Sequence, residues 1–138
     1  MKKAFWCLMA ALLLAFLPVF PQPASAGNDP YVATVYNERN GLPTGEANVV
    51  YQTSDNYIWI GSYGGLVRYD GSSFRNLSQE GLIPSSSIRA LLEDSEGRLW
   101  VGTNDAGLFV HENGAFTRVQ EAGEPVLLCI RDLIQNKD

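Results

Sequence analysis

Two tryptophans, each preceded by acidic residues, are the side chains of this sequence best suited to chemistry. Trp59 and Trp100 could stack on a sugar or an aromatic ligand. Four acids in the same stretches could hold a cation or act as general acid and base. These acids are Asp55, Glu93, Asp94 and Glu96. A plainer interpretation is favoured for both groups: the tryptophans pack in apolar strands, and the acids make local hydrogen bonds in tight turns.

The remaining candidates for chemistry are few. His111 is the only histidine, and it stands where a matching stretch of the chain has Tyr69, so a packing or surface role is favoured. Cys129 is expected to be a small core residue of a strand. The sequence has no Gly-x-Ser-x-Gly, His-Glu-x-x-His or paired-cysteine motif. We therefore predict no catalytic residue, no metal site and no cofactor.

The elements that position these residues form a repeat. "QTSDNYIWIGS" at residues 52–62 and "EDSEGRLWVGT" at residues 93–103 share one pattern, and their tryptophans lie 41 residues apart. The similarity extends over residues 41–77 and 81–119, from a shared Gly-Leu to matching phenylalanines, Phe74 and Phe116. A period of about 40–45 residues indicates the blades of a β-propeller.

Each repeat divides into four short runs separated by turns rich in Asp, Asn, Ser and Gly, which is typical of tight hairpins. The pattern predicts an all-β fold of four-stranded antiparallel blades, about two blades with partial first and third units. The stretch "SSSIRALLEDSEG", residues 85–97, also suits a helix, with serine at the cap. Its partner in the first unit is a poor helix former, so we expect a strand there.

The N-terminus has the layout of a secretory signal peptide. Lys2 and Lys3 precede an apolar run at residues 4–16, and the small-x-small site Ala24-Ser25-Ala26 predicts cleavage after residue 26. The alternative is an uncleaved membrane anchor, although the run is shorter than the roughly 20 residues that span a bilayer. Without the two lysines, 8 basic residues face 15 acidic ones, a net charge of −7. This balance argues against nucleic acid or an anionic membrane as partner.

The ends of the chain extend the repeat. Residues 1–26 are expected to be the signal peptide and 27–40 the outer strand of an incomplete blade. Residues 41–79 are predicted to form the first blade and 80–122 the second. "IRDLIQNKD" at residues 130–138 matches "IRALLEDSE" at residues 88–96, so 123–138 is expected to start a truncated third blade. We expect a fragment of a longer propeller.

The stretches "GLP…VVYQTSDNYIWIGSYGGLVRYDG" and "SIRALLEDSEGRLWVGTNDAGL" resemble the two-component regulator propeller repeat family. The resemblance implies an extracytoplasmic sensor propeller, periplasmic in location and N-terminal to a transmembrane helix. It further implies a cytoplasmic output domain, a histidine kinase or a diguanylate cyclase, in an inner-membrane protein. The second unit departs from the family pattern at His111-Glu112, where Tyr-Asp is usual.

The differences between the two units suggest a binding face. The second unit has insertions at Ile83 and within residues 104–106, in two connections that emerge on the same face of a blade. Chance variation in loop length, without any binding role, would also place two insertions on one face. A ligand-facing rim is predicted from four residues, Tyr63, Gly64, Asn104 and Asp105. The ligand would be an unknown small molecule or saccharide, and two alternatives stay open: a lyase-like enzymatic propeller and a non-functional truncated fragment.

Overall fold

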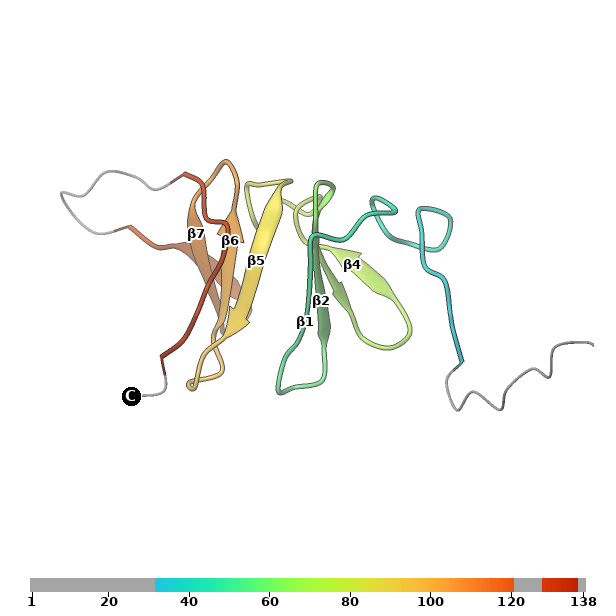
Figure 1. Cartoon of the computed structure of the whole chain (residues 1–138), viewed down its shortest axis with the longest axis horizontal. Coiled ribbons are helices and arrows are strands. Elements are labelled where there is room, and N and C mark those ends of the chain that lie inside the picture. Colours follow the sequence, from blue (N-terminus) through green and yellow to red (C-terminus); the bar gives the residue numbers. More distant parts are fainter. Residues whose placement is uncertain (1–31, 121–127, 137–138) are drawn as a thin grey trace, which may run out of the picture. The chain divides into compact units, whose positions relative to one another are not determined.

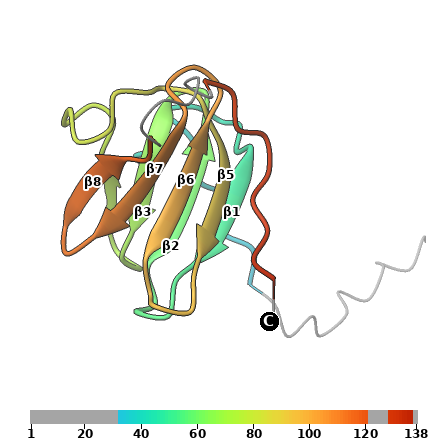
Figure 2. The ribbon, with the colours of Figure 1, turned by 90° about the vertical axis from the view of Figure 1, so that its left-hand side faces the viewer.

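Two four-stranded antiparallel sheets make up the regular structure of the chain, in a computed structural model that describes residues 32–120 and 128–136. The first sheet consists of β1 (Val49–Gln52), β2 (Ile58–Ser62), β3 (Gly65–Tyr69) and β4 (Phe74–Asn76). The second consists of β5 (Ile88–Glu93), β6 (Leu99–Thr103), β7 (Leu108–Glu112) and β8 (Ala115–Arg118). Within each sheet the strands pair in sequence order, so each repeat is one up-and-down blade (Figures 1 and 2).

The all-β prediction is confirmed, including the segment that suited a helix. Ile88–Glu93 is the strand β5, and it pairs antiparallel with β6. Burial explains the outcome: Ile88, Ala90 and Leu91 are buried against the first sheet and the neighbouring strand. Packing of this kind overrides the helix propensity of Ala, Leu and Glu.

The hairpin turns follow the chemistry that their residues predict. Asn56 has a φ of 68° in the β1–β2 turn, so asparagine takes the left-handed conformation that Gly97 takes in the second blade. Asp94 accepts backbone hydrogen bonds from Glu96 and Arg98, and Asp70 accepts them from the β3–β4 turn. These carboxylates hold the turns closed, as expected for aspartate at such positions.

The core lies between the two sheets, where β5 faces β1 and β2. Its buried apolar side chains come from both blades and from the β4–β5 connection. They are Trp59, Leu66, Leu77, Ile83, Ile88, Leu91, Leu99, Val101 and Phe109. One continuous core therefore joins the blades, and neither blade buries its apolar face alone.

A glycine in each tryptophan strand permits this approach. A Cβ atom on Gly61 would lie 2.6 Å from Ile88 Cγ2, and one on Gly102 would lie 2.7 Å from Ile130 Cγ2. Ile130 therefore lies over the second blade as Ile88 lies over the first. The Ile130 N–H also donates to Thr103 O at 2.7 Å, which ties this part of the chain to the end of β6.

The flanking segments differ in part from the expectation of strands. Residues 32–40, the described part of the segment expected to form an outer strand, contain no strand. Tyr36 nevertheless contacts the outer strands of the first blade, because its hydroxyl hydrogen-bonds Tyr69 at 2.9 Å and its ring meets Phe74 edge-on. Residues 128–136 also contain no strand. Cys129, expected in the core, is exposed, because Ile130 takes the inward position. The expected signal peptide, residues 1–26, lies outside the described residues.

We predict that Gly61→Ala destabilises the chain by about 1–3 kcal/mol, because the new methyl group overpacks the contact with Ile88. Urea denaturation of the full chain measures the change. Gly45→Ala is the matched control, since a Cβ there meets only the flexible Glu38 side chain. Equal stabilities of the two variants would contradict the close approach of the blades.

Candidate functional site

Trp59 is a packing residue, Trp100 is half-buried, and each is anchored by a hydrogen bond from its indole N–H. Trp59 is 2% exposed, and its ring meets His111 and Phe116 of the second blade. Its indole N–H donates to Thr53 Oγ1 at 3.0 Å, and that of Trp100 donates to Asp94 Oδ2 at 2.7 Å. Thr53 and Asp94 occupy the same turn position in the two repeats. Packing between blades, as predicted, is confirmed for Trp59.

The four acids do not form a catalytic group. Asp55 and Asp94 serve turns, and Glu96 pairs with Arg98 at 2.9 Å. Glu93 differs from the prediction, because it lies in β5 and accepts hydrogen bonds from the backbone and the hydroxyl of Ser54 in the first blade. Gln135 and Ser95 repeat this contact 3.3 Å apart. Glu93 is thus a link between blades.

His111 lines a cavity of about 310 Å³ together with Trp59, Arg68 and Glu93. This cavity lies at the end of the sheets that carries the β1–β2, β5–β6 and β7–β8 turns. Burial lowers the pKa of His111, the Arg68 charge lowers it further, and Asp55 raises it. The imidazole therefore favours its neutral form, which suits its ring contact with Trp59 at 5.3 Å. The packing role predicted for this histidine agrees with its position.

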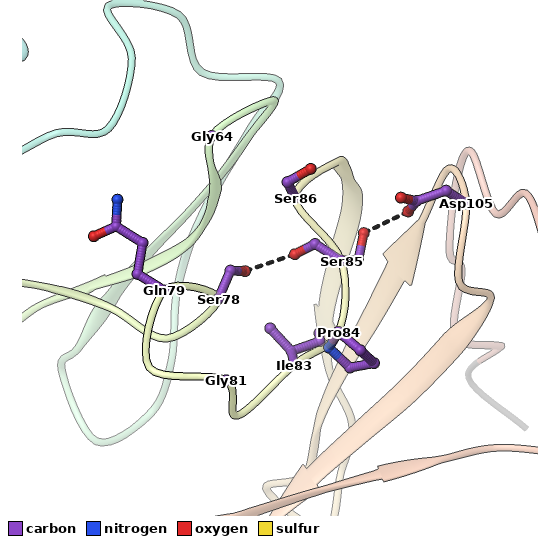
Figure 3. A pocket seen from close by; sticks show the side chains of 9 residues that line it. All are labelled: Gly64, Ser78, Gln79, Gly81, Ile83, Pro84, Ser85, Ser86 and Asp105. Carbon is purple, nitrogen blue, oxygen red and sulfur yellow. Dashed lines mark hydrogen bonds between the residues drawn. The ribbon is translucent and has the colours of Figure 1, made fainter.

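The opposite end of the sheets carries an open pocket of about 430 Å³ (Figure 3). Its walls come from the β2–β3 and β6–β7 loops and from the β4–β5 connection, and they mix hydroxyl groups with short apolar side chains. The lining residues are Gly64, Ser78, Gln79, Gly81, Ile83, Pro84, Ser85, Ser86 and Asp105. Both insertions of the second repeat fall in these segments.

A row of hydrogen bonds fixes the polar wall of this pocket. Ser78 Oγ donates to Ser85 O at 2.7 Å, and Ser85 Oγ donates to Asp105 Oδ1 at 2.5 Å (Figure 3). Ser78 Oγ also accepts from the Leu66 N–H, which ties the row to β3. The wall therefore holds one carboxylate and a set of hydroxyl groups in defined positions, which are the donors and acceptors that orient a polar ligand.

Buried hydroxyl groups hold the loops at the pocket in shape. Ser62 Oγ accepts from the Gly64 N–H and donates to Gly65 O. Thr103 Oγ1 does the same between the Ala106 N–H and Gly107 O. The β2–β3 and β6–β7 loops can thus differ in length, because the hydroxyl group at the start of each loop is bonded to the glycine at its end.

The structure brings two of the four predicted rim residues, Gly64 and Asp105, into one pocket. Tyr63 is 51% exposed beside it, and its ring lies under the Arg89 guanidinium. Asn104 instead contacts Cys129, and its N–H donates to Ser87 O. The prediction missed Ser78 and Ser85, although the serine run at 85–87 lies in the connection that carries the first insertion.

In the described ranges, 32–120 and 128–136, no cluster of three or more metal-binding side chains occurs. The described part of the chain also contains no helix long and apolar enough to cross a membrane.

Comparison with known families gives two matches to one sequence model. The two component regulator propeller model matches residues 41–64 and 82–105, which span β1–β2 and β5–β6. The predicted resemblance is confirmed at both positions, and each matched stretch lies in one of the two blades. Comparisons with curated proteins and with solved structures gave no match.

We predict that Trp100→Phe raises the pKa of Asp94. The indole N–H of Trp100 is the largest cause that holds this pKa far below its usual range, and hydrogen bonds from Arg98 add to it. Because the folded-state pKa is depressed, the stabilisation is complete above the unfolded value of about 3.9 and is lost as the pH falls below it. The variant should lose less stability on acidification than the wild type.

An NMR titration of the Asp94 carboxyl carbon measures this shift. Trp59→Phe is the matched control, since its indole donates to Thr53 and not to an acid. An unchanged Asp94 titration in Trp100→Phe would refute the assignment.

Proposed function

We propose that this chain, with its two component regulator propeller repeats, forms part of a periplasmic β-propeller that binds a small molecule or a saccharide. Ligand occupancy would regulate a histidine kinase or a diguanylate cyclase across the inner membrane. Export by a signal peptide at residues 1–26 belongs to the same proposal. Further blades and a transmembrane output module would complete the sensor.

The observation that carries the binding proposal is the pocket formed by loops of both blades. Its residues lie on the one face where the two repeats differ in length, while β2 and β3 below them have the same lengths as β6 and β7. Variation limited to loops on a rigid scaffold is typical of binding surfaces. A ligand there would contact Ser85 and Asp105 of the second repeat and Gly64 of the first, so its binding would bridge two blades.

A non-catalytic role fits the polar groups of this pocket. Asp105 already accepts a hydrogen bond from Ser85, and the other side chains with polar groups are those of Ser78, Gln79, Ser85 and Ser86. Such groups orient a ligand by hydrogen bonding and supply neither a histidine base nor an activated nucleophile.

We predict that Ser86→Trp blocks the pocket. Ser86 is exposed and lines the pocket. A set of small molecules and saccharides is first screened against the full chain by NMR, with shifts at Gly64, Ser85 and Asp105 as the readout. A ligand found in this way should lose at least about tenfold in affinity, or about 1.4 kcal/mol, in the variant.

Ser72→Trp, in the β3–β4 turn at the other end of the sheet, is the matched control and should bind as the wild type does. Equal affinities in both variants, or a set of ligands that shifts none of the three signals, would refute binding in this pocket.

A further inference from the structure

Arg89 stands at an irregular point of β5. Ile88 pairs with Thr103 and Ala90 pairs with Gly102, so Arg89 is one extra residue against two consecutive partners. A bulge of this kind in an edge strand turns its side chain away from the regular alternation. The first repeat has Asn48 at the matching position, because Val49 pairs with Gly61 as Ala90 pairs with Gly102, so the fold does not need a cation there.

The guanidinium of Arg89 is held in place by an aromatic ring from the other blade. Its Cζ atom lies 4.7 Å from the centre of the Tyr63 ring, in the β2–β3 loop. Stacking on an aromatic face limits the conformations of an arginine and leaves the edge of its planar group free to donate. The contact thus positions a cation without using its hydrogen-bond donors.

These donors find no acceptor among residues 32–120 and 128–136. Arg75 and Arg98 each pair with a carboxylate, at 2.6 Å and 2.7 Å, whereas Arg89 has no ion pair in this part of the chain. Two buried side-chain atoms there lack a hydrogen-bond partner, and they are Arg89 Nε and Ser87 Oγ, two residues apart in sequence. Both atoms are shielded from solvent, so a ligand reaches them only after a local movement. The Nη groups of Arg89 also have no hydrogen bond within these ranges and are not among the buried atoms, so they are the donors that an acceptor from outside the protein can reach.

The chain connects this position directly to the pocket described above. Gly64 and Ser86 line that pocket and are the chain neighbours of Tyr63 and Ser87, while Tyr63, Ser87 and Arg89 lie outside its lining. We propose that Arg89, stacked on Tyr63 beside Ser87, binds an anionic oxygen group of the ligand, whose remaining part occupies the pocket. The inference rests on the proposed binding function and narrows its ligand to an acid, either a carboxylate or a sulfate or phosphate ester.

Small oxyanions test the proposal on the full chain. Acetate, sulfate and inorganic phosphate are titrated separately at constant ionic strength, adjusted with sodium chloride, while NMR follows the Arg89 Nε–H and the amides of Tyr63 and Ser87. At least one anion should give saturable shifts at all three positions. A response to acetate alone assigns a carboxylate, and a response to the tetrahedral anions assigns a sulfate or phosphate.

Arg89→Gln should lower the affinity at least tenfold, and Arg118→Gln, which removes an exposed arginine of β8, should leave it unchanged. Tyr63→Ala should weaken binding severalfold, because the ring that positions the guanidinium is gone. If Arg89→Gln does not fold, Arg89→Lys takes its place, and it should bind severalfold more weakly because its ammonium lacks the planar fork.

Two outcomes overturn the proposal: no saturable response to any of the three anions, or equal affinity in the wild type and the Arg89 variant. If a neutral ligand still binds in the pocket and is blocked by Ser86→Trp, anion recognition fails while the binding function stands. If no ligand binds in the pocket but the anions respond at Arg89, the binding function fails and the anion site stands alone.

Discussion

The contact between a glycine of one blade and an isoleucine of the next is the constraint on which this structure depends. Gly61 has no side chain at the point where Ile88 crosses β2, and Gly102 has none where Ile130 crosses β6. A larger residue at either place would separate the sheets. Because the sheets approach this closely, Trp59 is covered by the second blade and the core continues across both repeats. Stability in such an array comes from neighbouring units, as in other repeat proteins.

Polar contacts at the β1–β2 and β5–β6 turns also hold neighbouring units at this distance. Ser54 of the first turn donates to Glu93 of β5, and Gln135 of residues 128–136 donates to Ser95 of the second turn. The loops at the other end of the sheets are brought together as a consequence. Gly64 of the first blade and Asp105 of the second face one pocket, because the strands beneath them have a fixed spacing. The proposed binding function thus follows from the packing of the blades, while its specificity resides in the loops.

The sequence predicts the strands well because the repeat supplies two independent copies of each pattern. The segment at 85–97 shows the value of this comparison, since its own residues suit a helix and its partner in the first repeat does not. Contacts between units are harder to predict. Glu93 reads as a turn acid, and only the packing of β5 on the first blade places it beside Ser54. Arg89 gave no signal, because a bulge is invisible in a pattern of alternating residues. Cys129 was assigned to the core from its type, whereas its neighbour Ile130 takes that place.

Residues 128–136 continue the spacing of the two blades, although they form no strand. Nuclear Overhauser effects measured by NMR on the full chain can test this spacing. We expect an effect between the Gly102 α-protons and an Ile130 methyl group, matching the one between Gly61 and Ile88. An effect for the Gly61–Ile88 pair with none for the Gly102–Ile130 pair would contradict the claim, and it would limit the repeated packing to the two blades alone.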